Sequence, residues 1–217
     1  MDSKKLKYII SIGSFIISVI IFLILFFNIP RLTYSYNEEY EGYFIKNAYG
    51  NSKEYEIPRE YKNVKIVGID ERAFLNHSKL ERVELPSTIK VIERLAFSEC
   101  DNLSSINLEN VEVIYRNAFS YCRKLNNITV GAKSIGASAF YKCEALDNVV
   151  LLDTTFEIGS MAFSHTAITS IFIPRNVFYL QNDCFYGCYA LRNINVYGNN
   201  LKNNQYLKQL DIVTYIG

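Results

Sequence analysis

Apolar residues recur with one spacing through about two-thirds of the chain. The stretch Val91–Leu108 shows the unit: an isoleucine, then an Ala-Phe pair, a cysteine, a leucine, an isoleucine and a leucine. The phenylalanine of this pair returns at intervals of 23, 22, 21, 23 and 22 residues. Its copies are Phe74, Phe97, Phe119, Phe140, Phe163 and Phe185. Such a period predicts a solenoid, because a lone coil cannot bury its apolar face without neighbours.

Each unit divides into three parts. The first is a short strand whose inward residues stand at positions 1, 4 and 6, as Leu103, Ile106 and Leu108 do. After a turn comes a second short apolar segment, such as the one containing Phe156 and Ile158, whose apolar residues we also expect to point inward. The Ala-Phe segment is expected to form a helical or 3₁₀ turn that leads into the next strand.

The unit I-x-x-x-A-F-x-x-C-x-x-L-x-x-I-x-L-P resembles the BspA-type leucine-rich repeat family over about residues 55–197. We assign about six repeats to residues 61–197. The resemblance implies a repeat solenoid of the leucine-rich-repeat type, built mainly from short β-strands with short helical or 3₁₀ turns. It also implies a surface protein that works by binding. Residues 198–217 match no repeat and are expected to form a C-terminal cap or tail.

The amino-terminal region is a separate apolar segment. Residues 8–29 carry no charge, and 22 helical residues span about 33 Å, enough for a hydrocarbon core of about 30 Å. Three lysines precede the run and one arginine follows it, which favours a cytoplasmic basic segment at residues 1–7 and an extracellular repeat domain. A cleaved signal peptide is the alternative, but its apolar region is normally about 7–15 residues long. We predict one transmembrane helix that precedes the solenoid as a single-pass anchor.

A tyrosine-rich stretch connects this segment to the repeats. We expect residues 30–39 to be a juxtamembrane linker and residues 40–60 to form a β-hairpin that caps the first coil. The hairpin would pair residues 43–49 with residues 53–57 around the turn Gly50-Asn51-Ser52.

The charge balance argues against a nucleic-acid partner. The chain has 23 basic and 22 acidic residues. Without four basic residues and one acidic residue near the amino terminus, the remainder has a net charge of −2. No basic stripe typical of nucleic-acid binding is visible.

The cysteines follow the repeat. Four of the five share one position per unit, where a small buried apolar group suffices: Cys100, Cys122, Cys143 and Cys188. We therefore favour buried free thiols, although adjacent coils would permit a bridge. One ligand per coil makes a line and not a closed zinc tetrahedron, so no metal site is predicted.

No catalytic constellation emerges from the sequence. Two histidines at fixed solenoid positions do not assemble a nucleophile and base, and no G-x-S-x-G or glycine-rich phosphate loop occurs. We predict no enzyme activity and no cofactor.

The strand positions that the repeat leaves free are the expected binding surface. The outward column next to the last inward residue, with two amides of the preceding column, forms the candidate partner-binding set. It comprises Glu84, Asn107, Thr129, Val150, Phe172, Asn195, Asn127 and Asn148. Val150 and Phe172 form an apolar spot, which suits a protein anchor or a sugar ring.

The sequence thus predicts a membrane-anchored surface protein that binds a protein or glycan partner in adhesion or recognition. The alternative is a structural or accessory envelope protein that positions another membrane protein through its span.

Overall fold

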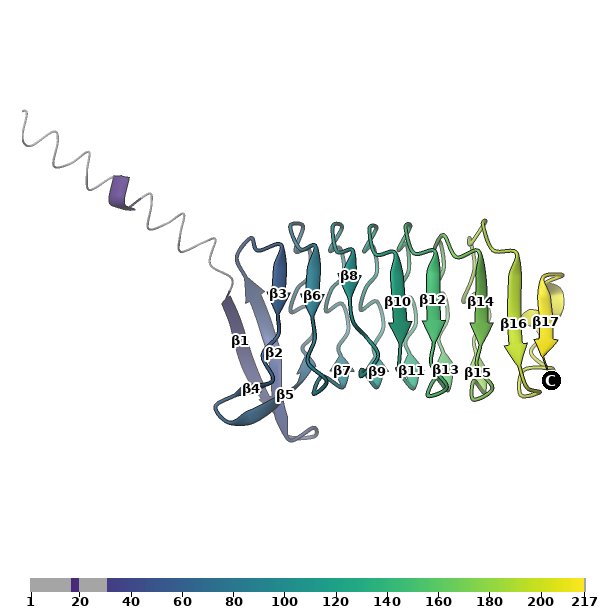
Figure 1. Ribbon diagram of the computed structural model, residues 1–217, viewed down its shortest axis with the longest axis horizontal. Helices are drawn as coiled ribbons and strands as arrows, with labels where there is room; N and C mark the ends of the chain where they lie inside the picture. Colours follow the sequence, from purple (N-terminus) through teal and green to yellow (C-terminus); the bar gives the residue numbers. More distant parts are fainter. Residues whose placement is uncertain (1–16, 20–30, 217) are drawn as a thin grey trace, which may run out of the picture.

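The protein is a stack of short coils along one axis (Figure 1). The structure is a computed structural model that describes residues 17–19 and 31–216. The predicted span at residues 8–29 and the basic segment at residues 1–7 lie outside the described residues, apart from residues 17–19, which are helical. Within the described part of the chain, no helix combines the length and the apolar character that a membrane crossing requires.

Each coil contributes one strand to a front face, which we call the strand face. It consists of three sheets that follow one another along the stack. Their strands are β3 (Glu54–Glu56), β6 (Arg82–Glu84) and β8 (Ser105–Ile106); β10 (Asn127–Val130) and β12 (Asn148–Leu151); and β14 (Ser170–Ile173), β16 (Asn193–Tyr197) and β17 (Val213–Ile216).

A second strand from each coil forms a continuous sheet behind the strand face, which we call the rear sheet. Its strands are β1 (Arg31–Asn37), β2 (Gly42–Tyr49), β5 (Val64–Ile69), β7 (Val91–Ile92), β9 (Val113–Ile114), β11 (Ser134–Ile135), β13 (Glu157–Ile158) and β15 (Tyr179–Leu180), and β4 (Glu60–Tyr61) pairs with β5. The pairing between successive coils is parallel and joins like residues, for example Ile92 with Ile114. The predicted solenoid of stacked coils is confirmed.

The phenylalanine column forms the centre of the core. The rings of Phe74, Phe97, Phe119, Phe140 and Phe163 are fully buried, and successive rings stack with centroids 4.8–5.3 Å apart. This spacing is close to the separation of neighbouring strands, so every ring contacts the ring of the next coil.

The Ala-Phe segments form a third edge of the solenoid, the turn edge, but they are not helices. In the turn that contains Phe119, the amides of Ala118 and Ser120 bond three residues back, as in a 3₁₀ turn. The amides of Asn117, Phe119 and Tyr121 instead donate to carbonyls of the next coil. Asn117 and Tyr121 have positive φ values of 60° and 63°, which turns these amides towards the neighbouring coil. The expected helical or 3₁₀ turn is therefore correct for only two of these five hydrogen bonds.

The expected linker at residues 30–39 and the expected hairpin at residues 40–60 were both wrong. β1 lies where a linker was expected and pairs antiparallel with β2. The turn Gly50-Asn51-Ser52 does not close a hairpin, because β2 joins the rear sheet beside β5 and β3 joins the strand face beside β6. Burial explains the difference: Ile45 on β2 and Tyr55 on β3 both belong to the core, so residues 42–57 complete a first coil. The cap is then β1, which covers the edge of that coil.

The carboxy-terminal segment continues the stack without a repeat motif. β17 pairs in parallel with β16, and a 3₁₀ helix, η1 (Leu207–Gln209), precedes it. Leu201 and Leu207 are buried against the last coil. Residues after 197 therefore close the end of the hydrophobic core.

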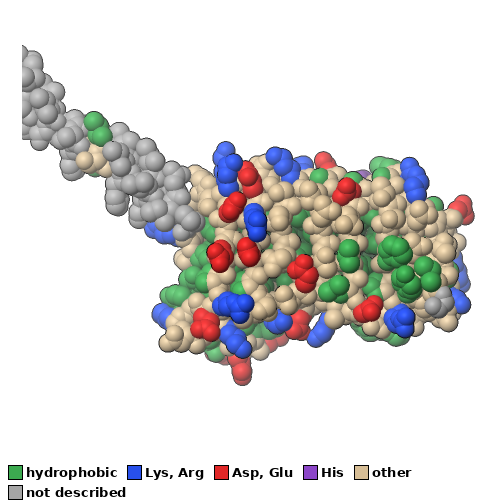
Figure 2. Space-filling view, in the orientation of Figure 1, with side chains coloured by type: hydrophobic (Ala, Val, Ile, Leu, Met, Phe, Trp, Pro, Cys, Tyr) green, Lys and Arg blue, Asp and Glu red, His purple; other side chains and the backbone are tan. Residues whose placement is uncertain are grey.

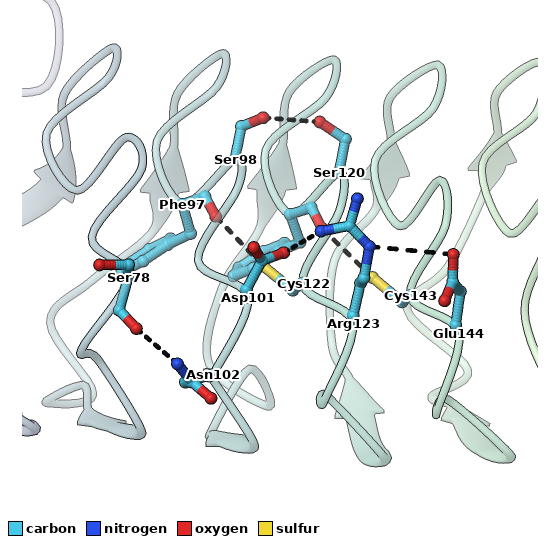
Figure 3. Close-up of polar contacts among 11 residues, drawn as sticks. Ser78, Phe97, Ser98, Asp101, Asn102, Ser120, Cys122, Arg123, Cys143 and Glu144 are labelled. Atoms are coloured by element: carbon cyan, nitrogen blue, oxygen red, sulfur yellow. Dashed lines mark hydrogen bonds and ion pairs between the residues drawn. The ribbon is translucent and has the colours of Figure 1, made fainter.

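All five cysteines are free and buried, as predicted. In the repeat position, each thiol donates a hydrogen bond to the carbonyl of the phenylalanine in the preceding coil. Figure 3 shows the bonds of Cys122 and Cys143. Cys122 Sγ lies 3.1 Å from Phe97 O, and Cys143 Sγ lies 3.2 Å from Phe119 O. Burial raises the pKa of the Cys100 thiol to about 12. These side chains serve as small apolar groups with one internal donor each.

Candidate binding face

The strand face presents the predicted binding residues in rows. Thr129 and Val150 lie opposite each other on β10 and β12, and Phe172 and Asn195 lie opposite each other on β14 and β16. Alternation along each strand turns the intervening residues into the core. Val150 is 45% exposed and Phe172 is 52% exposed, so the expected apolar spot is open to solvent.

Tyr197 extends this apolar spot and was not in the predicted set. Its ring stacks on Phe172 with centroids 6.0 Å apart and an interplanar angle of 24°. We call Val150, Phe172 and Tyr197 the aromatic patch. Figure 2 shows hydrophobic side chains gathered over the carboxy-terminal strands of this face. Tyr197 comes directly after the last inward residue of its strand, and an exposed aromatic at that position was the signal that could have revealed it.

A shallow depression lies beside the aromatic patch. Four predicted residues line it together with residues of β8: Asn107, Asn127, Thr129 and Asn148. Its volume is about 260 Å³. The strand pairing is interrupted here, since β8 and β10 are joined only by the bridge between Leu108 and Val130 within the described residues. The gap between the sheets thus creates an amide-lined hollow.

Asn107 differs from the other predicted residues because its side chain is already engaged. Its Oδ1 accepts the Leu85 N–H at 2.8 Å, and its Nδ2 donates to the Leu85 carbonyl, also at 2.8 Å. The amide therefore replaces the strand pairing that ends at Val83 and Ile106. We assign Asn107 a structural role in joining two coils.

The ion pairs lie towards the amino-terminal end of the solenoid. In the repeats that the structure describes, the ion pairs join residues between positions 53 and 144. Arg123, for example, bridges Asp101 and Glu144 of the two neighbouring coils on the turn edge (Figure 3). Glu84 Oε2 lies 3.3 Å from Arg82 Nη2, so this predicted binding residue is part of an exposed ion pair. The aromatic patch lies beyond these pairs, where Thr129 neighbours Val150 and Asn195 neighbours Phe172.

A second group of exposed rings lies at the start of β13 and β15 of the rear sheet. The ring of Phe156 has its centroid 5.4 Å from Phe178 and 5.2 Å from Tyr179. The expectation that Phe156 points inward was wrong: the side chain is 44% exposed, and Thr155 takes the buried position. Phe156 bonds through its amide to the carbonyl of Lys133, and so continues an outward column of charged residues.

The thiols and histidines do not form a reactive cluster. Burial raises the pKa of every cysteine thiol and lowers the pKa of His77, which keeps these groups neutral. In the part of the chain that the structure describes, no group of three His, Cys, Asp or Glu side chains could hold a metal ion.

Stacked parallel coils with recurrent leucine, isoleucine and Ala-Phe columns define a leucine-rich-repeat solenoid. A family model described as a BspA type leucine rich repeat region, with six copies, matches residues 45–133 and 112–209. The chain therefore belongs to the BspA-type leucine-rich repeat family. Leucine-rich repeat proteins of this kind are generally not enzymes.

Solved structures share this fold. A leucine-rich cell surface protein from Faecalibacterium prausnitzii is 24% identical, with a TM-score of 0.58 over 77% of this chain and 54% of its own. The leucine-rich repeat protein of T. pallidum is 23% identical, with a TM-score of 0.54 over 76% of this chain and 68% of its own. The pneumococcal vaccine antigen PcpA is 16% identical, with a TM-score of 0.56 over 81% of this chain and 45% of its own.

The chain thus spans about half of the length of the F. prausnitzii protein. A comparison with curated proteins finds no match.

Proposed function

We propose that the chain is a membrane-anchored surface protein that binds a protein or glycan partner and catalyses no reaction. Residues 8–29 would anchor it, with residues 1–7 in the cytoplasm and the repeats outside the cell. The uncharged apolar run and the preceding lysines support this topology. The F. prausnitzii protein of similar fold is described as a cell surface protein, which agrees with it.

The observation that carries the binding proposal is the aromatic patch on the strand face. A stacked pair of half-exposed rings loses little conformational freedom on binding and offers a large apolar area. Asparagine side chains on neighbouring strands supply donors and acceptors around it, and none of the ion pairs described above crosses it. A neutral protein surface or a sugar ring has the matching chemistry.

The test compares two phenylalanines with the same exposure. Phe172 and Phe178 are each 52% exposed, but Phe172 lies on the strand face and Phe178 directly precedes β15 of the rear sheet. The repeat domain, residues 31–217, is screened against extracellular proteins and glycans, and any ligand found is titrated against variants. Phe172→Ala should weaken binding about 10-fold or more, and the matched control Phe178→Ala should leave it unchanged. Equal affinities of the wild type and Phe172→Ala, or a loss confined to Phe178→Ala, would contradict the proposal.

The topology has its own test. In intact cells that express the full chain, an added protease should cleave an epitope placed after residue 217 and spare one placed before residue 1. The reverse pattern would reject the proposed orientation. If an unrelated apolar helix in place of residues 8–29 abolishes function while the repeats stay exposed, the chain acts through its span as an accessory protein.

A further inference from the structure

The turn edge passes hydrogen bonds from one coil to the next in a fixed pattern. In the turns of Phe74, Phe97, Phe119 and Phe140, three alternate amides donate to carbonyls of the following turn. In the turn of Phe163, the amides of Phe163 and His165 do so, and the Met161 amide donates to Asp183 Oδ1. The amides of Ser138, Phe140 and Lys142 donate to the carbonyls of Ser160, Ala162 and Ser164 at 2.8, 2.8 and 3.0 Å. The acceptor turn, residues 160–164, is uncharged in every side chain. A turn at the end of the stack therefore keeps three donors that face along the solenoid axis.

Asp183, Phe185 and Gly187 hold these three positions in the last turn. Residues 199–216 contribute no Ala-Phe turn over them, and among the described residues no backbone carbonyl accepts from the amides of Asp183 or Gly187. The pKa of Tyr206 is raised mainly by burial and lowered in part by the backbone N–H of Phe185, so the Tyr206 hydroxyl lies near this amide. Tyr206 thus lies near one of the three donors, and the amides of Asp183 and Gly187 are the other two.

These donors lie at a pocket between the last turn and the carboxy-terminal segment. The pocket has a volume of about 460 Å³. Phe185, Tyr206 and Leu210 give it apolar walls, while Asn182 and Gln209 add side-chain amides. Gly187 has a φ of +74° and carries no side chain there, unlike Lys142 and His165 at the same position of earlier coils.

The charges at the pocket determine which kind of acceptor can bind the amides of Asp183 and Gly187. No lysine or arginine lines it. Its one carboxylate, that of Asp183, already accepts from Ser160 Oγ at 3.0 Å and from the Met161 amide at 3.3 Å. A free carboxylate or phosphate would enter without a compensating cation and close to this negative charge. Peptide carbonyls are neutral, and they are the acceptors that the equivalent amides of Ser138 and Lys142 meet.

We propose that this pocket binds an uncharged turn segment of a partner polypeptide, whose carbonyls take the place of a following coil. Its backbone would accept from Asp183 and Gly187, and an apolar side chain would pack on Phe185 and Leu210. This is a main-chain recognition mode that continues a ladder of the fold. It uses residues other than those of the aromatic patch, so the two proposals stand or fall separately.

Amide hydrogen exchange tests the free donors. On the ¹⁵N-labelled full chain in mild detergent, the amides of Asp183 and Gly187 should exchange at least about 100-fold faster than that of His165, their bonded counterpart. His165 donates to the Tyr186 carbonyl at 2.9 Å. Equal protection of all three amides at every protein concentration would overturn the proposal. Protection of the Asp183 and Gly187 amides that appears only as the protein concentration rises would show that a second copy of this chain fills the pocket. That result would also reject the proposed binding of a partner polypeptide.

A peptide probe tests the occupant. The acetylated and amidated pentapeptide Ser-Met-Ala-Phe-Ser, which is the acceptor turn 160–164, should shift the Asp183 and Gly187 resonances with a Kd of about 1 mM. Leu210→Lys should weaken this binding at least about 10-fold, whereas the control Lys208→Ala, just outside the pocket, should not. Phe172→Ala should bind the probe normally. No shift with the pentapeptide, a shift with acetate alone, or unchanged binding by a folded Leu210→Lys would refute the assignment.

Discussion

Thr155 is a buried polar residue whose replacement should make the protein more stable. Its side chain is fully buried, and its Oγ1 has no hydrogen-bond partner. Equivalent positions of other coils carry Ile89, Val111 and Val177, all buried. Thr155→Val keeps the shape and replaces the unpaired hydroxyl with a methyl group that the neighbouring coils already accommodate. A buried hydroxyl without a partner costs about 1–3 kcal/mol, so we expect the variant to gain about 1–2 kcal/mol.

Thr166 provides a matched control, because its replacement by valine should lower the stability. It is also buried, but its Oγ1 donates to the Phe163 carbonyl at 2.9 Å and lies 3.2 Å from Cys188 Sγ. Thr166→Val removes a satisfied hydroxyl and should cost about 1 kcal/mol. The loss stays modest because Cys188 Sγ still donates to the Phe163 carbonyl, at 3.0 Å.

Thermal unfolding followed by circular dichroism distinguishes the two variants. For a domain of this size, 1 kcal/mol shifts Tm by about 2–4 °C. Thr155→Val should therefore unfold several degrees above the wild type, and Thr166→Val a few degrees below it. A Thr155→Val protein that melts at or below the wild-type temperature would refute the reasoning, as would a rise in both variants.

Three further predictions concern the columns of the solenoid. Phe119→Ala should lower the free energy of unfolding by about 3–5 kcal/mol in urea titration, because it leaves a cavity in the ring stack; a loss below about 1 kcal/mol would contradict the stacked core. Asn107→Ala should cost about 1–3 kcal/mol by leaving the N–H and carbonyl of Leu85 unpaired, whereas exposed Asn148→Ala should change stability by less than about 0.5 kcal/mol. Burial raises the pKa of Cys100 to about 12, so the folded protein binds this proton more tightly than the unfolded chain does. The resulting stabilisation is complete below about pH 9 and should be lost progressively from pH 9 towards 12 in unfolding titrations. A free energy of unfolding that rises across this range would contradict the buried thiol.

The cysteine prediction also has a chemical readout. In the native protein at pH 8 the five thiols should resist iodoacetamide, and in urea all five should react, because the thiolate is the nucleophile and burial disfavours it. A mass that rises by two units for any cysteine pair on reduction would show a disulfide and contradict free thiols.

The repeating part of the fold follows from spacing alone. Phe119 and its copies occupy equivalent environments, so one period determines which residues point inward, which neighbour they meet and which outward columns form a surface. The same period is enough to place Val150 and Phe172 on the strand face. The outward column also included Asn107, but spacing could not show that its side-chain amide hydrogen-bonds the backbone of Leu85.

The sequence alone determined which residues form the repeated inward and outward columns. The tertiary structure decided the features that are not repeated in the next coil. Residues 43–49 could pair with either flanking strand, and β2 pairs with β1 because its other edge is occupied by β5 of the rear sheet. Phe156 is exposed because Thr155 fills the buried position, and a shift of one residue reverses the side of a strand. The free amides of Asp183 and Gly187 exist because the following segment lacks an Ala-Phe turn. A repeat specifies a residue by what surrounds it in every coil, so positions at the ends and at local shifts depend on contacts that only the folded chain makes.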